Sequence, residues 1–380
     1  MGGLLALTIA STSACQSLGI GSEDTGDIVI GADLELSGPL AAVGTAYRRA
    51  LDLKRDQINR SGVLGARKLR IEVTDNGSDP SLSQTNIAKF LDRSDVAAII
   101  TGACSECLAA SSKLLNERHM PTVALAPASD VVNPVEQPYI FKLGPNAKDS
   151  AAALARELQR SRAETAALVV ADDAYGREGR SALEGELRKL DVEMTVSTVR
   201  LADTDLTQAV QKALDDKPDV IILWLFPDQA AAAAASARHA GFKGQLYLDM
   251  AAAGDLFLGE PAAKAIDNAI MISTHTMAID DVIATTPAKA ARKQWFRDYT
   301  SRYGGYNAYA SYAADALQLI VNAIQTIGEI DRARIRDILE TTQIDGLSGP
   351  LRMTPDNHSG LMPQALTALV ARGGRWRVSG

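Results

Sequence analysis

Short apolar runs alternate with amphipathic stretches along most of the chain. Residues 96–100 (VAAII) are typical of a buried strand, because the run is short and every position is apolar. The stretch AYRRALDLKRDQI has helical periodicity instead, and its apolar face comprises Tyr47, Ala50, Leu51 and Ile58. Short buried strands that alternate with helices predict β-α-β units around a parallel sheet.

This alternation occurs twice along the chain. The strands predicted in the first series are residues 28–30, 69–73, 96–100 and 122–125. The strands predicted in the second series are residues 166–170, 192–196, 220–226, 245–248 and 269–272. From residue 287 the pattern is mostly helical, and residues 366–378 predict a strand and a turn. We therefore expect an α/β protein with two doubly wound parallel-sheet lobes.

The place of a ligand follows from this architecture. In doubly wound sheets, ligands bind beyond the carboxyl ends of the strands. Two such lobes that face each other would hold a ligand between them, and the segment TGACSEC (residues 101–107) follows one of these strands. This segment is the first candidate for a ligand-binding loop.

Composition narrows the class of partner. The chain has 380 residues, a net charge of −7 and no block of Lys and Arg. That balance argues against nucleic acid and against an anionic membrane surface as main partners. The sequence contains no run of about 18 apolar residues, so it predicts no membrane-spanning segment.

The first 27 residues differ from the rest. MGGLLALTIASTSAC is an apolar stretch followed by small residues and Cys15, which is the pattern of a secretory signal. Small residues that end at a cysteine resemble a bacterial lipoprotein signal, with Cys15 as the lipidated residue. The polar, Gly/Ser-rich residues 16–27 predict a linker. A disordered apolar tail is the alternative.

The other two cysteines, Cys104 and Cys107, have C-x-x-C spacing. Zinc needs four ligands, but the only further cysteine is Cys15 and the four histidines are scattered, so no metal site is expected. An exported protein enters an oxidising compartment, which favours a Cys104–Cys107 disulfide. Two free thiols and a catalytic redox centre remain as alternatives.

Several phrases, in order, resemble the leucine/isoleucine/valine-type substrate-binding proteins of ABC importers, which have the type I periplasmic-binding fold. They are IGADLELSGPLAAVGTAYRRALDL, IEVTDNGSDPSLSQTNIAKFL, DDAYGREG, SYAADALQLIVNAI and IDGLSGPLRM. The resemblance covers residues 28–377 and implies two lobes that are joined by three crossovers and close on a small ligand. It places lobe 1 at residues 28–144 and 275–355, and lobe 2 at residues 145–274 and 356–380.

The resemblance also implies the first-lobe side of the ligand site. The family carries a serine that binds the ligand's carboxylate after the fourth strand, here Ser105, with Cys104 before it. A hydroxyl and free N–H groups at a helix start suit an anion, although a simple helix-capping serine is the alternative. In the segment ALAPAS, Ala126 and Ser129 are the candidate contacts and Leu125 a candidate apolar wall.

The second lobe is expected to add aromatic side chains and a carboxylate. Tyr175 and Phe226 are the candidate rings over the ligand, and either could instead be a core residue, as is more typical of Trp224. An ammonium group needs a carboxylate or carbonyl partner, for which Asp249 is the candidate. Asp249 lies one or two residues before the family's acidic position. The alternatives are Asp173 and Asp228, which are more typical of solvated turns.

These features predict a non-enzymatic, monomeric, extracytoplasmic protein without a cofactor, anchored to the membrane by lipid alone. We expect it to deliver a small apolar amino acid or analogue to an ABC permease. A flytrap sensor that signals to a partner is the alternative of another class, and an amide or aromatic acid is the alternative ligand. The chain contains no G-x-S-x-G motif and no phosphate-binding loop, which argues against an enzyme.

Overall fold

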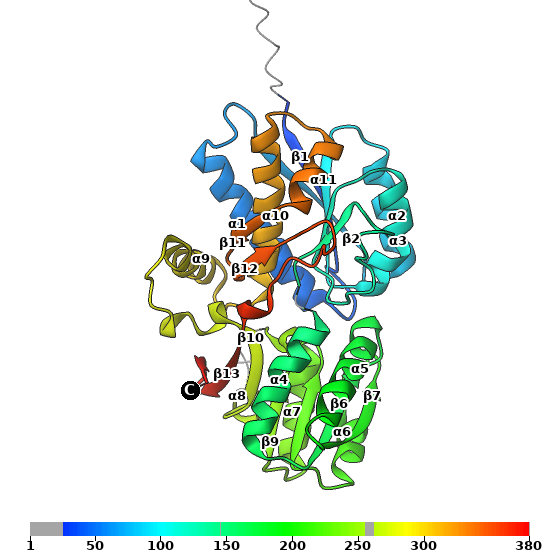
Figure 1. Cartoon of the computed structure of the whole chain (residues 1–380), viewed down its shortest axis with the longest axis vertical. Helices are drawn as coiled ribbons and strands as arrows, with labels where there is room; N and C mark the ends of the chain where they lie inside the picture. Colours follow the sequence, from blue (N-terminus) through cyan, green and yellow to red (C-terminus); the bar gives the residue numbers. More distant parts are fainter. Residues whose placement is uncertain (1–25, 145, 255–261, 380) are drawn as a thin grey trace, which may run out of the picture.

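The computed structural model describes residues 26–144, 146–254 and 262–379. Figure 1 shows two α/β lobes stacked along the long axis, with helices on both faces of each sheet. Cys15 and the predicted signal and linker lie outside the described residues, apart from the end of the linker. The two-lobed α/β fold predicted from the alternating pattern is therefore confirmed.

The first lobe is built on a parallel sheet with the strand order β2-β1-β3-β4-β5. Its strands are β1 (Ile28–Leu34), β2 (Leu69–Asp75), β3 (Val96–Thr101), β4 (Thr122–Ala124) and β5 (Ile140–Lys142). Strand β1 pairs in parallel with both β2 and β3, so it is an interior strand, and all of its residues are buried. This position explains why its apolar run is nearly continuous.

Two pairs of helices cover this sheet. Helix α1 (Ala41–Ser61) packs against α10 (Tyr309–Ile327), and α2 (Pro80–Leu91) packs against α3 (Ser105–Glu117). Helix α11 (Arg332–Glu340) contacts α10. A small antiparallel pair, β11 (Gln343–Asp345) and β12 (Pro350–Arg352), follows it. The late helices thus return to the first lobe (Figure 1).

The second lobe contains a mixed sheet with the order β14-β13-β10-β9-β8-β6-β7. Its strands are β6 (Thr165–Ala171), β7 (Glu193–Val199), β8 (Val220–Trp224), β9 (Gln245–Leu248), β10 (Ile270–Thr274), β13 (Leu366–Arg372) and β14 (Arg375–Val378). Strands β6 to β10 are parallel, whereas β13 is antiparallel to β10 and to β14.

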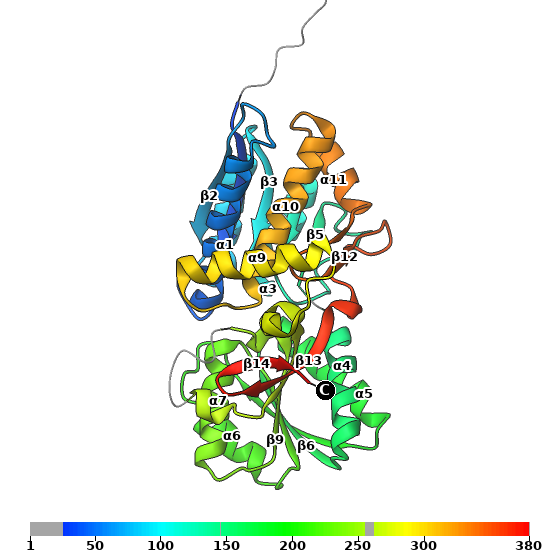
Figure 2. The same cartoon turned by 90° about the vertical axis from the view of Figure 1, so that its left-hand side faces the viewer.

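Helices also cover both faces of this second sheet. On one face α4 (Ala147–Ser161) packs against α5 (Ala174–Arg188). On the other face α7 (Pro227–His239) packs against α6 (Thr207–Leu214) and α8 (Ala262–Ala265). The β13–β14 hairpin forms one edge of this sheet and faces the viewer in Figure 2.

The chain passes between the lobes after β5, after β10 and before β13. The second passage contains the 3-10 segment η2 (His275–Asp281) and α9 (Pro287–Tyr303). The third follows a turn held by buried Asp315, whose carboxylate accepts the backbone N–H groups of Leu347 and Ser348, both at 2.8 Å. The lobe limits at residues 144, 274 and 355 remain predictions at the level of single residues.

Several elements differ from the sequence-based expectation. The run 220–226 is a strand only to Trp224, because Pro227 begins α7 and Phe226 is its N-cap residue. Residues 366–378 form two strands, and the turn between them is made by Gly373 and Gly374 at positive φ. Strand β5 was not predicted, since its three residues are too few to show a period.

Candidate ligand site between the lobes

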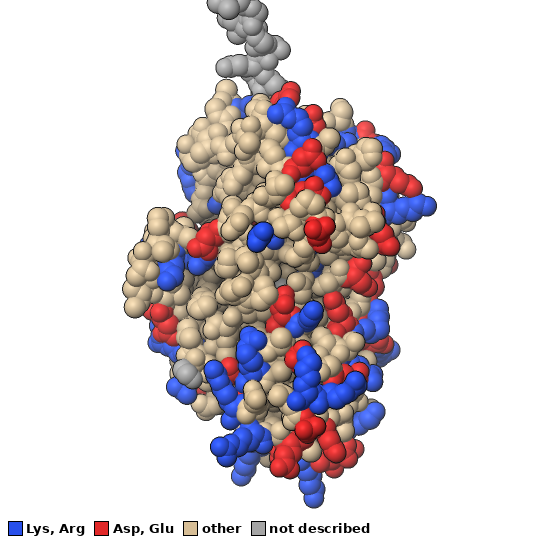
Figure 3. Space-filling model, viewed as in Figure 1, with Lys and Arg blue, Asp and Glu red and all other residues tan. Residues whose placement is uncertain are grey.

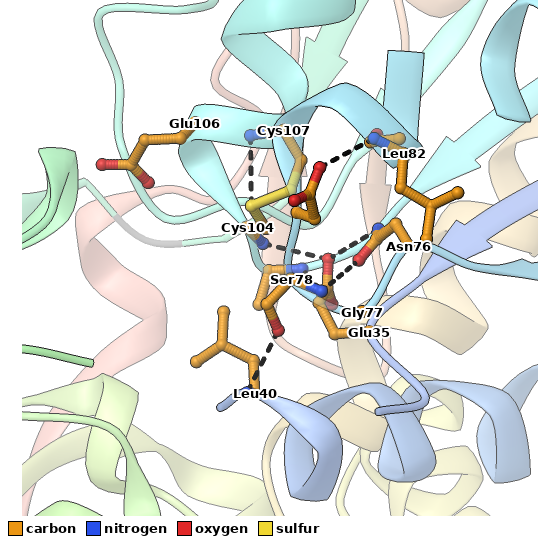
Figure 4. The surroundings of a disulfide bond; sticks show 12 residues. Glu35, Leu40, Asn76, Gly77, Ser78, Leu82, Cys104, Glu106 and Cys107 are labelled. Carbon is orange, nitrogen blue, oxygen red and sulfur yellow. Dashed lines mark hydrogen bonds between the residues drawn. A yellow bond between two sulfur atoms is a disulfide. The ribbon is translucent and has the colours of Figure 1, made fainter. Parts of the chain in front are cut away.

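The loop after β3 carries the two paired cysteines. Cys104 and Cys107 form a disulfide, and the Sγ of Cys104 accepts the backbone N–H of Cys107 at 3.1 Å (Figure 4). Cys104 is therefore the N-cap residue of α3, where a Ser, Thr, Asp or Asn is more usual. The bond fixes the first turn of α3, which begins with Ser105.

Ser105 is buried next to the segment after β4. Its Oγ accepts the backbone N–H of Ala128 at 3.3 Å, which leaves the hydroxyl proton able to donate to a ligand. Leu125 and Ala126 are also buried, and the carbonyl of Leu125 accepts the hydroxyl of Tyr47 at 3.2 Å. The structure thus brings the predicted first-lobe residues together at the carboxyl ends of β3 and β4.

A carboxylate lies at the start of α3 as well. Glu35, at the end of β1, is 0% exposed and accepts the N–H groups of Ala103 at 2.9 Å and Cys104 at 3.1 Å. Asn76 donates to the same carboxylate at 3.3 Å (Figure 4). Burial raises the pKa of Glu35, and these hydrogen bonds offset part of that rise.

The second lobe contributes a tyrosine and a buried aspartate. The hydroxyl of Tyr175, in the first turn of α5, donates to Oδ2 of Asp249, which also accepts the N–H of Ala251 at 3.1 Å. Burial raises the pKa of Asp249 to about 7, while the Tyr175 hydroxyl and the Ala251 and Leu225 backbone N–H groups act against the rise. Its other oxygen, Oδ1, makes no hydrogen bond of normal geometry to any described residue.

Two further aromatic rings surround Tyr175. Its ring centroid lies 5.4 Å from that of Trp224 and 6.3 Å from that of Phe226. Trp224 is fully buried in the second-lobe sheet, as expected from its strand position. Phe226 lines a narrow pocket whose first-lobe wall includes Pro39 and Leu40, so this ring faces the boundary between the lobes.

The prediction that Asp173 is a solvated turn residue is wrong. This residue is 4% exposed and is the N-cap of α5, where its Oδ1 accepts the N–H of Gly176 at 2.7 Å. Burial raises its pKa to about 6. Asp228 is exposed, as expected, and also lines the narrow pocket. Neither residue replaces Asp249 as the carboxylate next to Tyr175.

Helix α10 brings two tyrosines from the first lobe to the same strand end. The hydroxyl of Tyr309 donates to the carbonyl of Ala251, and that of Tyr312 contacts the Sδ of Met250 at 3.1 Å. Tyr309 also packs edge-on against Tyr47 of α1, with the ring centroids 5.5 Å apart. The interlobe site thus has aromatic walls from both lobes.

Two carboxylates join the lobes directly. Glu106 in α3 accepts the backbone N–H of Ala174 at 2.7 Å, and Glu178 in α5 accepts the backbone N–H of Ser129 at 2.9 Å. Arg177 adds an ion pair to Glu106 at 3.6 Å. The lobes are therefore in contact, and Figure 3 shows no open groove between them on the face that it presents.

Sequence reasoning missed Glu35, Glu106, Glu178, Tyr47 and Tyr309. The sequence could have indicated a buried carboxylate at Glu35, because Asp33 and Glu35 are acidic residues at the end of an otherwise apolar strand. A charged residue in a buried strand rarely lacks a specific partner. The glutamates of α3 and α5 gave no such signal, since acidic residues are common on exposed helix faces.

The described part of the chain shows neither a metal site nor a membrane span. Within it, no three His, Cys, Asp or Glu side chains are placed to hold an ion. None of its helices is long and apolar enough to cross a bilayer. Tyr175 and Asp249, buried between the lobes, remain the candidate site for a small organic solute.

Comparison with known proteins agrees with this class of site. Residues 27–374 match the family model described as periplasmic binding protein, so the chain belongs to that family of extracytoplasmic solute-binding proteins. A relative named Leu/Ile/Val-binding protein homolog 7, from Brucella abortus, is 20% identical over 90% of this chain and 86% of its own.

Solved structures show the same fold. An extracellular ligand-binding receptor from Rhodopseudomonas palustris HaA2 has a TM-score of 0.83 at 24% identity, covering 93% of this chain and 99% of its own. An ABC-transporter solute-binding protein from Rhodopseudomonas palustris, solved with 4-hydroxybenzoate, has a TM-score of 0.80 at 18% identity over 93% of this chain and 95% of its own.

Proposed function

We propose that the protein captures a small apolar amino acid or a close analogue outside the cytoplasm and delivers it to an ABC permease. The ligand lies between the lobes, against Ser105, Ala126 and Ser129 on one side and Tyr175 and Asp249 on the other. Leu125, Cys104 and Phe226 complete the walls. The protein acts as a monomer, performs no reaction and is held at the membrane by a lipid on Cys15.

The observation that carries this proposal is the unpartnered oxygen of Asp249. This carboxylate is 0% exposed, and no described residue donates to its Oδ1. A buried charge without a partner costs several kcal/mol, so the arrangement favours a ligand that brings a hydrogen-bond donor or a cation. Aromatic walls around it suit the apolar part of a small solute.

The distribution of charged side chains on the surface favours a small ligand over a charged polymer. On the face shown in Figure 3, basic side chains are interspersed with acidic ones over both lobes. Strong nucleic-acid binding requires basic residues gathered on one face. The match to a Leu/Ile/Val-binding relative supports an amino-acid-sized ligand in place of a nucleotide or a polyanion.

Thermal unfolding tests the proposal. The purified protein is screened with apolar amino acids, their amides and amines, and aromatic acids. A ligand at about 1,000 times its dissociation constant adds about 4 kcal/mol to the free energy of unfolding, which raises the Tm by many degrees. We expect such a rise with at least one compound, and none with that compound in Asp249→Asn. A Tm that no compound changes would contradict the proposal.

A further inference from the structure

The carboxylate of Asp249 is held by donors from two different elements. Asp249 follows β9 and is the N-cap residue of a short 3-10 turn, η1 (Met250–Ala252). Its Oδ2 accepts the backbone N–H of Ala251 at 3.1 Å and the hydroxyl of Tyr175. The first donor belongs to the same turn, whereas the second comes from helix α5. The Tyr175 hydroxyl is thus a donor to Asp249 from outside its own segment.

The backbone of this turn is fixed by the first lobe. At the start of α10, the N–H of Ala308 donates to the carbonyl of Ala253 at 3.0 Å. The hydroxyl of Tyr309, the next residue, donates to the carbonyl of Ala251. With the backbone of the turn held in this way, the orientation of the Asp249 carboxylate depends on its side-chain donor.

Close packing of α5 on the ends of two strands fixes the position of Tyr175, which is 1% exposed. A Cβ atom on Gly176 would lie 1.8 Å from the carbonyl oxygen of Ala171 at the end of β6. A Cβ atom on Gly179 would lie 2.2 Å from the ring of Trp224 at the end of β8. Because only glycine permits these approaches, the first turn of α5 lies tightly against both strands, and the Tyr175 ring lies 5.4 Å from that of Trp224.

No basic side chain is among the described groups that act most on Asp249. Burial raises its pKa to about 7, and the Tyr175 hydroxyl opposes this rise more than any other group does. The backbone N–H groups of Ala251 and Leu225 oppose it less, and the carboxylate of Asp173 adds to it. The titratable side chains that face Asp249 come from α5 and α10 and are Tyr175, Asp173 and Tyr309.

We infer that Tyr175 is the positioning residue of Asp249: its hydroxyl proton goes to Oδ2 of this carboxylate, and so orients it, in place of going to the ligand. A donor to a carboxylate also favours the charged form of that group. This inference rests on the proposed function, in which Asp249 meets the ligand. A carboxylate that is oriented before the ligand arrives loses less conformational freedom on binding, which increases affinity.

Titration of the Asp249 carboxyl group in the purified protein tests this role. The protein is labelled with ¹³C at the aspartate Cγ and titrated by NMR, and the resonance that is missing from Asp249→Asn belongs to Asp249. Tyr175→Phe keeps the ring and removes the donor, so the midpoint of this resonance should rise by about half a pH unit or more. An unchanged midpoint in a folded Tyr175→Phe protein overturns the inference.

Tyr247→Phe is the matched control. Tyr247 is also 1% exposed and lies in β9, two residues before Asp249, but its hydroxyl interacts with Ser161 at the end of α4. Removing this hydroxyl should leave the midpoint of Asp249 unchanged. An equal rise in both variants would show that a general loosening of the lobe, and not the loss of the Tyr175 donor, moves the midpoint, and would overturn the inference.

Affinity for L-leucine separates this inference from the proposed function. Isothermal titration calorimetry between about pH 5 and pH 9 gives the pH at which the affinity is half its maximum, and this pH should rise in Tyr175→Phe by as much as the NMR midpoint. A leucine affinity that does not change with pH would contradict the contact between Asp249 and the ligand. Absence of leucine binding to wild type would contradict the apolar amino acid of the proposed function, while the NMR midpoint still decides the role of Tyr175.

Discussion

The backbone N–H of Ser129 in the first lobe donates to the carboxylate of Glu178 in the second lobe at 2.9 Å. The reverse arrangement lies nearby in sequence, where the N–H of Ala174 in the second lobe donates to Glu106 of the first at 2.7 Å. Each lobe therefore supplies one carboxylate to a backbone amide of the other. Both hydrogen bonds must break when the lobes separate.

We expect Glu106→Ala and Glu178→Ala to speed the release of bound ligand about five- to tenfold. Losing a partly exposed charge-assisted hydrogen bond costs roughly 1–1.4 kcal/mol, and this cost falls on the closed form alone. Stopped-flow dissociation measures the rate. Glu184→Ala on the same helix is the matched control, because Glu184 pairs with exposed Arg180 one turn away on that helix. Equal rates in all three variants would show that these bonds do not hold the lobes together.

The titration of Asp249 should make stability depend on pH. Burial raises its pKa from 3.8 to about 7, so the folded protein retains a proton that the unfolded chain loses. The stability from this group is complete below about pH 4 and is lost as the pH rises to about 7. Asp249→Asn should therefore gain stability relative to wild type across this range. Urea unfolding at several pH values measures the difference.

The same measurement has an internal control. Glu35 and Asp173 also have raised pKa values, but they titrate in both proteins and largely cancel in the difference. A difference in the free energy of unfolding that stays constant from pH 4 to pH 7 would show that Asp249 is not protonated in the folded protein. A cationic ligand should bind more weakly below pH 7, where protonation removes the charge of Asp249.

Replacing Ser105 by alanine tests the first-lobe side of the site. A hydroxyl that donates to a neutral amide is worth about 0.5–1.5 kcal/mol, and one that donates to a carboxylate about 1.5–3 kcal/mol. The loss of affinity in Ser105→Ala thus reports the chemistry of the bound group. Ser112→Ala is the control, since that exposed hydroxyl donates to the carbonyl of Ala109 within the same helix. A dissociation constant equal to that of the control would reduce Ser105 to a structural residue.

Reduction of the Cys104–Cys107 disulfide should destabilise the protein modestly. The closed loop spans only three residue steps, for which chain entropy predicts about 2 kcal/mol or less. Affinity should fall as well, because the Sγ of Cys104 caps the helix that presents Ser105. Unfolding with and without a reductant, and the mass after thiol alkylation, test both points. Two alkylated cysteines in the untreated protein would contradict the pairing.

The sequence was sufficient for the fold because buried strands and amphipathic helices have distinct periods. Residues 96–100, for example, are apolar throughout since β3 is covered on both faces. The end of β8 was misplaced because the apolar run continues through Phe226, whereas the proline after it begins a helix. The antiparallel β13–β14 edge was missed because one short run cannot reveal its partner.

The site was only partly predictable for a different reason. Ser105, Tyr175 and Asp249 follow strands directly, so the topology alone brings them to one cleft. The roles of Glu35 and Glu178 depend on which backbone amide each carboxylate reaches, which is a tertiary relationship without a local pattern.

The most direct test of the account is the radius of gyration, measured by small-angle X-ray scattering with and without the compound that raises the Tm most. If the lobes close on a ligand at Asp249, saturating compound should reduce the radius of gyration of the wild-type protein. The same compound should leave Asp249→Asn unchanged. A compound that binds tightly without contracting the wild-type protein, or that contracts Asp249→Asn equally, would contradict the interlobe site.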